Sequence, residues 1–198
     1  MKTKMSKGNL FIVTGPSGAG KGTVLGRVMP SMEDLHYSVS ATTRAPREGE
    51  EDGVNYYFLR KEQFLEMIGQ GAFLEHAEYV GNYYGTPAGP VDECLNKGMD
   101  VVLEIEVQGA LIVKQKRPEA KLVFIIPPSF SDLELRLRSR GTEETIAKRL
   151  EKAREEYQMA DQYDYIVLND KVEKAADELR AIILASRCAV GRRINLLR

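Results

Sequence analysis

The chain has 198 residues, of which 43% are apolar and 29% are charged, as expected of a folded globular domain. Its 28 basic and 29 acidic side chains leave a net charge of −1, so a general attraction to nucleic acid or to an anionic membrane is not expected. Cys94 and Cys188 form no CxxC pair, and the apolar run 10–13 is too short for a signal sequence or a membrane span. Composition therefore predicts a cytoplasmic protein without a nucleic-acid or membrane partner, and it leaves the oligomeric state open.

The first 89 residues form two segments that differ in composition and in hydrophobic pattern. Residues 9–14 are typical of a short buried strand, and after a glycine-rich turn residues 21–29 are typical of a helix. From 37 to 89 the chain is rich in glycine and tyrosine, with short alternating runs such as 78–84. This segment predicts a small, mostly antiparallel insertion with one helix near 61–68.

From residue 90 onward, apolar strands and charged helices alternate. We expect strands at 100–105, 122–126 and 165–168, and helices near 91–96, 110–116, 132–140, 143–160 and 172–186. Pro127 and Pro128 end the second of these strands, and the last helix has the clearest apolar period. The alternation predicts an α/β fold, in which helices cover both faces of a parallel sheet.

A glycine-rich segment lies between the first predicted strand and the first predicted helix, which is the context of a phosphate-binding P-loop. Its residues are Gly15, Pro16, Ser17, Gly18, Ala19, Gly20, Lys21, Gly22 and Thr23. Such a loop points backbone N–H groups at the phosphates of ATP, and Lys21 adds a charge for the β and γ oxygens. Gly22 stands where a hydroxyl would contact Mg²⁺, so Thr23 is the remaining hydroxyl candidate. A plain glycine-rich turn is the alternative, and the loop alone does not identify a reaction.

Residues 40–47 predict a second anion site. Pro46 disfavours helical geometry in the residue before it, so this stretch is a loop. Arg44 and Arg47 on a stiffened loop, with the hydroxyl of Ser40 nearby, suit the phosphate of a nucleoside monophosphate. A solvated basic loop is an equally open interpretation.

An acid and an aromatic run follow the helix predicted in the insertion. Glu75 stands shortly before the glycine-containing run 79–86. The hydroxyls of Tyr84 and Thr86, on either side of Gly85, are candidates for completing a phosphate and base pocket. The alternative is a surface hairpin with packed tyrosines.

Two acids end the strand predicted at 100–105. In an extended chain Glu104 and Glu106 project from the same face, roughly 6.6 Å apart along the strand. A strand covered on both faces is normally apolar, so acids at its carboxyl end mark an opening toward a ligand. We assign Glu104 to the water shell of Mg²⁺ and Glu106 to the base, with two solvated acids as the alternative.

Carboxylates in a nucleotide pocket favour guanine over adenine. A carboxylate only accepts hydrogen bonds, and guanine offers two donors, at N1 and at its exocyclic amine. Adenine has an acceptor at N1 and would leave the acid unpaired, a mismatch that can give rejection of about 10⁴–10⁵-fold. The acids therefore point to GMP rather than AMP.

Four arginines, Arg136, Arg138, Arg140 and Arg149, lie in and after a charged helical stretch. On a helix Arg136 and Arg140 share a face and Arg138 points away. Phosphoryl transfer needs charge neutralisation, which a segment carrying these arginines would supply by closing over ATP. Without the P-loop, the same run indicates an ordinary solvated helix.

Together these segments resemble the guanylate kinase family from about residue 7 to residue 188. The motifs that carry the resemblance are GPSGAGKGT, SVSATTRAPREGE, NYYF, FLEHAEYVGNYYGT, LEIEVQGA, RLRSRGTEE and IVLND. It implies a P-loop nucleoside-monophosphate-kinase fold that transfers the γ-phosphate of ATP to GMP, with Mg²⁺ as cofactor. The implied core is 7–36, 90–130 and 150–198, with a GMP-binding insertion at 37–89 and a lid at 131–149.

The resemblance also implies roles for individual residues. The phosphate of GMP would meet Ser40, Arg44, Arg47, Tyr56 and Tyr84, guanine would meet Glu75, Thr86 and Glu106, and the lid arginines would be Arg136, Arg140 and Arg149. Two positions depart from the family pattern, because Gly22 replaces a serine or threonine and Glu106 stands where an aspartate is common.

Two other interpretations are open from the sequence. Gly22 also suits a kinase specific for AMP or CMP, against which the pocket acids argue. A guanylate-kinase-like domain that binds peptides without catalysis characteristically loses the P-loop lysine or the phosphate arginines, whereas Lys21, Arg44 and Arg47 are all present. An assay of ADP release with and without GMP distinguishes these interpretations.

Overall fold

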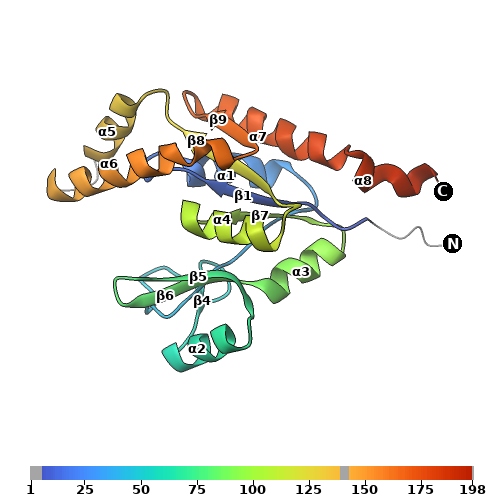
Figure 1. Cartoon of the computed structure of the whole chain (residues 1–198), viewed down its shortest axis with the longest axis horizontal. Helices are drawn as coiled ribbons and strands as arrows, with labels where there is room; N and C mark the ends of the chain where they lie inside the picture. Colours follow the sequence, from blue (N-terminus) through green and yellow to red (C-terminus); the bar gives the residue numbers. More distant parts are fainter. Residues whose placement is uncertain (1–5, 139–142, 198) are drawn as a thin grey trace.

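Five parallel strands form the core sheet, in the order β2-β7-β1-β8-β9 (Figure 1). The computed structural model describes residues 6–138 and 143–197. The strands are β1 (Leu10–Thr14), β2 (Leu35–Tyr37), β7 (Asp100–Glu104), β8 (Lys121–Ile126) and β9 (Tyr165–Leu168). All five residues of β1 are buried, as its apolar sequence requires of a central strand covered on both faces. The predicted parallel core is confirmed.

Helices cover both faces of this sheet. They are α1 (Lys21–Val28) and α7 (Val172–Arg187) on one face, and α3 (Ala88–Asn96) and α4 (Val107–Lys116) on the other. Because side chains alternate along a strand, Phe11 and Val13 pack with α1 and α7. Leu10 and Ile12 pack with α3 and α4. Val13 also pairs with Glu104, so the loop after β1 begins beside the end of β7.

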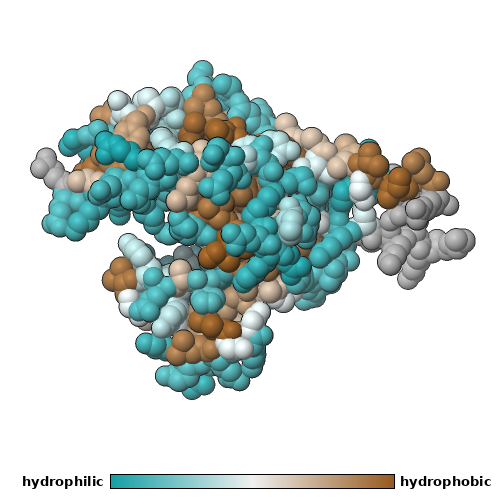
Figure 2. All heavy atoms as spheres, viewed as in Figure 1, coloured by the Kyte–Doolittle hydropathy of each residue, from teal (hydrophilic) through white to brown (hydrophobic). Residues whose placement is uncertain are grey.

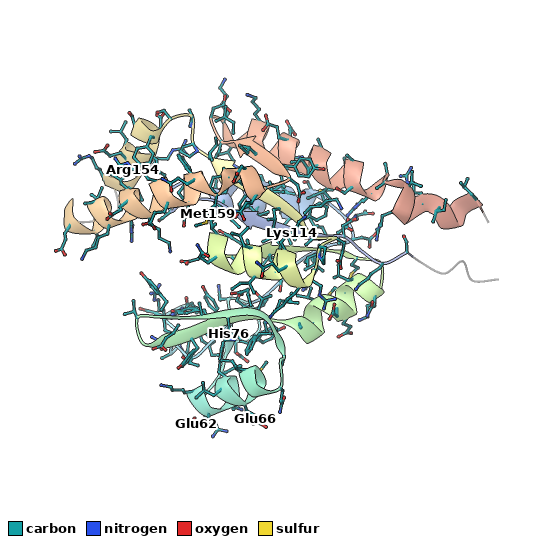
Figure 3. All side chains as sticks on the ribbon, in the orientation of Figure 1. Glu62, Glu66, His76, Lys114, Arg154 and Met159 are labelled. Atoms are coloured by element: carbon teal, nitrogen blue, oxygen red, sulfur yellow. The ribbon has the colours of Figure 1, made fainter. Side chains whose placement is uncertain are left out.

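A smaller sheet forms the insertion, which lies below the core in Figure 1. Its strands, in the order β4-β3-β6-β5, are β3 (Ala41–Thr42), β4 (Tyr57–Phe58), β5 (Phe73–Tyr79) and β6 (Asn82–Pro87), and its helix is α2 (Lys61–Gly69). The β3–β4 pair is parallel and the other pairs are antiparallel. Phe64 of α2 stacks on Phe73, with 4.4 Å between ring centres, and so fixes the helix to the sheet. Glu62 and Glu66 lie on the outer side of α2 (Figure 3).

A hairpin, which the sequence left open as an alternative for this segment, is present here, and its turn interrupts the alternating run 78–84. Val80 and Gly81 connect β5 to β6, and both have positive φ, 48° and 73°. Two such residues match the twist of a tight hairpin. A valine rarely adopts positive φ, so this position does not look like a turn in the sequence.

Two further helices, α5 (Phe130–Arg138) and α6 (Glu143–Gln158), form what we call the α5–α6 arm. Leu133 and Leu137 of α5 belong to one buried cluster with Ile146 and Leu150 of α6. Arg154 projects from α6 toward α5, where its guanidinium carbon lies 4.8 Å from the ring centre of Phe130 (Figure 3). The lid expected at 131–149 therefore has its second boundary inside α6, which continues to Gln158.

Short helical turns complete the chain. They are η1 (Met29–Ser31), η2 (Ala160–Gln162), α8 (Val190–Arg193) and η3 (Ile194–Leu197). The end of α7 is tied to the start of β7, because Arg187 Nε donates a hydrogen bond to Asp100 Oδ2 at 2.7 Å. Within residues 6–138 and 143–197, no helix combines the length and the apolar character needed to cross a membrane.

Candidate active site

The loop between β1 and α1 wraps around its own lysine. Lys21 Nζ donates hydrogen bonds to the carbonyl oxygens of Gly15, at 2.6 Å, and Pro16, at 3.3 Å. Gly15 has a φ of 142°, and a Cβ there would come within 2.1 Å of the carbonyl oxygen of Ile125. Glycine is thus required at the entrance of this loop, since its neighbour is rigid backbone. The turn places the ammonium group at the start of α1, where phosphate oxygens are expected.

Acidic groups surround Lys21. Burial lowers the pKa of this ammonium group, and the negative charges of Glu104, Glu156 and Glu106 oppose that shift. Glu104 comes from the end of β7 and Glu156 from α6, so the lysine lies where the core sheet meets the α5–α6 arm. A cation in this position can attract an anionic ligand into a space that is otherwise acidic.

A cavity of about 580 Å³ opens over the P-loop, and we call it the loop cavity. Lys21, Gly22, Thr23, Glu104, Arg136, Asn169 and Asp170 are among its lining residues. Asn169, which is buried, donates a hydrogen bond from Nδ2 to the carbonyl oxygen of Ala19 at 2.7 Å. Arg136 donates to the same carbonyl oxygen at 3.4 Å and to that of Asn169 at 3.1 Å. Arg136 is thus fixed at the loop, as expected of an arginine that faces phosphates.

A central cavity of about 420 Å³ adjoins the loop cavity and shares Ser17, Lys21 and Glu104 with it. Tyr37, Tyr56, Glu106, Arg149, Lys152 and Glu156 also line it. Tyr37 donates a hydrogen bond from its hydroxyl to Glu104 Oε2 at 3.2 Å. Burial, followed by the charge of Glu104, raises the pKa of Tyr37, so its hydroxyl keeps its proton and remains a donor.

The prediction that Glu104 and Glu106 share one strand face was wrong. Strand β7 ends at Glu104, and Glu106 is the residue immediately before α4, with φ −74° and ψ 158°. Pairing with β1 stops at Glu104, and the chain then turns toward the helix that begins at Val107. The two acids nevertheless line the same central cavity. Glu106 Oε2 accepts a hydrogen bond there from Lys152 Nζ at 2.9 Å.

A third cavity, of about 410 Å³, lies between the insertion and α4, and we call it the insertion cavity. Figure 2 shows the molecule hollowed between the insertion and the body above it. Ser40, Tyr56, Glu75, Tyr84, Gly85, Glu104 and Glu106 are among its lining residues. The insertion cavity shares Tyr56, Glu104 and Glu106 with the central cavity, so the three spaces form one continuous row.

Glu75 is the buried acid of the insertion cavity. It is 8% exposed, and Thr86 donates a hydrogen bond from its hydroxyl to Glu75 Oε1 at 2.7 Å. Burial raises the pKa of Glu75, and the hydrogen bonds from Thr86 lower it in part. A Cβ at Gly109 would lie 3.0 Å from Glu75 Oε2, so α4 approaches this carboxylate closely. The side chain is therefore held on two sides.

The loop 40–47, which carries Arg44 and Arg47, follows Ser40 at the insertion cavity. Neither arginine is among the lining residues of the three cavities described above. The guanidinium carbon of Arg44 is 5.5 Å from the ring centre of Tyr56, which lines two of the cavities. Arg47 has an exposed side chain, and its backbone N–H donates to Glu50 Oε2 at 2.8 Å. In this structure Arg44 is paired with Glu50 and also contacts Tyr84, which lines the insertion cavity.

The three other arginines of the predicted lid region lie in different places. Arg149 lines the central cavity, Arg138 pairs with Glu134 on the surface of α5, and Arg140 lies outside the described residues. Sequence reasoning assigned no role to five residues that line the cavities, namely Tyr37, Lys152, Glu156, Asn169 and Asp170. The segment IVLND was the available signal for the last two, because it places polar residues directly after a core strand.

Comparison with known proteins agrees with this geometry. Residues 7–186 match the family model described as guanylate kinase. The chain is 52% identical over 191 residues to a guanylate kinase of Halalkalibacterium halodurans, covering 96% of this chain and 94% of that protein. It is also 52% identical to a guanylate kinase of Streptococcus pneumoniae, covering 96% and 92%. The crystal structure of guanylate kinase from Anaplasma phagocytophilum superposes with a TM-score of 0.76 at 32% identity, covering 95% of this chain and 90% of that chain.

Proposed function

The chain belongs to the guanylate kinase family, and we propose that its three adjoining cavities hold the donor, the transferred phosphoryl group and the acceptor of a single reaction. That reaction is the reversible transfer of the γ-phosphate of ATP to GMP, which gives ADP and GDP and recycles GMP in purine nucleotide metabolism. The observation that carries the assignment of cavities is their order, from Lys21 through Glu104 and Glu106 to Glu75.

We assign ATP to the loop cavity. The backbone N–H groups of residues 15–23 and the dipole of α1 would hold its phosphates, and Lys21 would contact the β and γ oxygens. Lys21 would exchange its bonds to the carbonyl groups of Gly15 and Pro16 for bonds to phosphate, which remain charge-assisted. Arg136, fixed at Ala19, would face the same phosphates.

Mg²⁺ fits the boundary between the loop and central cavities. Glu104 offers a carboxylate there, and Thr23 offers a hydroxyl in the same loop cavity. Magnesium in nucleotide sites binds one or two carboxylates and keeps several waters in addition to phosphate oxygens. We propose that Glu104 and Thr23 hold the water shell of the ion, with Tyr37 orienting Glu104. A bound ion would supply positive charge to the oxygens of the transferred group.

We assign GMP to the insertion cavity. Glu75 and Glu106 would accept hydrogen bonds from the N1–H and the exocyclic amine of guanine, and Thr86 would hold Glu75 in place. Ser40, Tyr56 and Tyr84, which line this cavity near Gly85, would meet the phosphate. Arg44 and Arg47 would complete that site, with Glu50 holding Arg44 and the backbone of Arg47 in place.

The central cavity is where the phosphoryl group would pass between the nucleotides. Transfer in line needs no side-chain nucleophile, and it requires that negative charge be neutralised and water be excluded. Lys21 and Arg149 already line this space, and Arg140 is assigned to it by family resemblance alone. Closure of the insertion and of the α5–α6 arm over the substrates would bring Arg44 and Arg136 closer to the transferred phosphoryl group. A cytosolic location stays a prediction from composition.

An assay of ADP release tests this assignment. We expect turnover with ATP and GMP, and a rate with AMP that is lower by about 10⁴-fold because adenine leaves the pocket acids unpaired. Lys21→Met should lower kcat by at least about 10²-fold, since it removes charge stabilisation of the transferred group. Equal turnover of AMP and GMP would overturn the assignment of guanine to Glu75 and Glu106.

A further inference from the structure

Lys152 joins the α5–α6 arm to the acid assigned to guanine. Its Nζ, on α6, lies 2.9 Å from Oε2 of Glu106, which precedes α4. The two side chains are 50% and 68% exposed, so the pair adds little to the free energy of unfolding. Its position in the site is therefore more informative than its strength.

Glu106 stands in the wall between two cavities, and Lys152 approaches it from one side. Glu106 lines both the central and the insertion cavity, whereas Lys152 lines the central cavity. The lysine donates to Oε2, and the side chain of Glu106 is 68% exposed, so the carboxylate remains accessible to a ligand. The carboxylate of Glu106 is thereby restrained before any nucleotide arrives.

The surroundings of Lys152 keep it positively charged. Burial lowers the pKa of Lys152, but its hydrogen bond to Glu106 and the charges of Glu106 and Glu156 outweigh that effect and raise the pKa. A lysine that stays charged remains a hydrogen-bond donor to one carboxylate oxygen of Glu106.

We propose that Lys152 is a positioning residue for GMP, which holds Glu106 by one oxygen so that the other can receive guanine. This inference rests on the proposed role of Glu106 in binding the base. A glutamate side chain has several rotatable bonds, and fixing it only when GMP binds would cost conformational entropy. The ion pair fixes the side chain of Glu106 before GMP binds. Because Lys152 belongs to α6, the position of this helix then affects how GMP is recognised.

Steady-state kinetics of Lys152→Met tests the inference. We expect KM for GMP to rise by up to about fivefold, the upper end of what an exposed ion pair contributes, with kcat and KM for ATP changed by less than about twofold. Lys152→Arg keeps the charge and should restore KM for GMP to within about twofold of the unmodified protein. Lys148→Met is the matched control, because Lys148 lies one turn earlier and pairs with Glu144 on the same helix. Thermal unfolding of each variant checks that it is folded.

A double-mutant cycle separates this role from others. In a Glu106→Gln background, Lys152→Met should change KM for GMP by less than about twofold, because its partner is already altered. Additive effects, or a fall in kcat with KM for GMP unchanged, would overturn the inference in favour of an independent role of Lys152 at the transferred phosphate. A raised KM in Glu106→Gln together with a normal KM in Lys152→Met would remove only this inference. No change in Glu106→Gln would instead remove the role of Glu106 in binding guanine.

Discussion

Arg44 and Glu50 form an ion pair inside the loop assigned to the phosphate of GMP, with 2.9 Å between Arg44 Nη2 and Glu50 Oε1. The other carboxylate oxygen accepts the backbone N–H of Arg47 at 2.8 Å. The hydrogen bond to Glu50 raises the pKa of Arg44, and the same bond lowers the pKa of Glu50. One carboxylate therefore orders both arginine positions in the absence of substrate.

Glu50→Ala should weaken GMP binding. The loop would then have to be ordered when the phosphate binds, and ordering of this kind raises KM for GMP by about fivefold. The measurement is KM for GMP and for ATP, with Glu48→Ala as the control from the same loop. A fall in KM for GMP would contradict this prediction and would mean that Glu50 acts as a competing anion for Arg44.

The core could be predicted from the sequence because its signals are local. Strand β9 (Tyr165–Leu168) has the bounds expected from its apolar run, and the P-loop lies between β1 and α1 as its glycines indicated. Each of these segments carries its own periodicity or turn chemistry. The hairpin near residue 80 was open as an alternative, but Val80 gave no signal for its place in the turn, since valine is a poor indicator of positive φ.

Tertiary contacts explain what the sequence could not predict. Asn169 contacts Ala19 across 150 positions, and Lys152 contacts Glu106 across 46, and no pattern within either segment encodes such a pairing. The end of β7 was misplaced for a related reason, because the strand ends where its pairing with β1 ends. The site was therefore predictable as a set of residue types, while their directions depended on the fold.

Gly22→Ser should strengthen the response to magnesium. A Cβ at Gly22 would lie 3.9 Å from Glu104 Oε2, which is an ordinary contact, so a serine fits and places a hydroxyl next to the acid proposed to hold the water shell of the ion. We expect the Mg²⁺ concentration for half-maximal activity to fall about threefold, since one more oxygen faces the ion.

Gly26→Ser on the same helix is the control, because a Cβ there meets nothing within 4 Å. Both substitutions should raise the free energy of unfolding by about 0.5 kcal/mol through helix propensity alone. An equal magnesium response in the two variants would argue against a metal site beside Gly22.

Asp100→Asn should destabilise the fold without touching the cavities. Asp100 is 1% exposed, and its carboxylate accepts from Arg187 Nε and from the backbone N–H of Asn9, each at 2.7 Å. Removing one partner of a buried charge pair costs about 3 kcal/mol, which urea unfolding would detect. Glu173→Gln breaks the exposed pair with Arg27 and should cost less than about 0.5 kcal/mol. Similar losses in both variants would contradict the anchoring role of Asp100.

Glu75 should give activity and stability opposite responses to pH. Burial raises its pKa above the ordinary value of 4.5, so the folded protein binds this proton more readily than the unfolded chain does. Between pH 4.5 and the raised pKa, the contribution of Glu75 to the free energy of unfolding therefore falls as pH rises. The ionised form is the one that accepts from guanine, so kcat/KM for GMP rises with pH over the same window.

Profiles of kcat/KM for GMP and of urea unfolding against pH, each compared with Glu75→Gln, measure both effects. Glutamine does not titrate, so the variant should lose part of the acidic limb of activity and should have a less negative slope of stability against pH. Burial also raises the pKa of Glu156, but that group is present in both proteins and cancels in the difference. If the acidic limb of kcat/KM were unchanged in Glu75→Gln, the ionisation that governs GMP binding would belong to another group, and Glu75 would not be the acid that receives guanine.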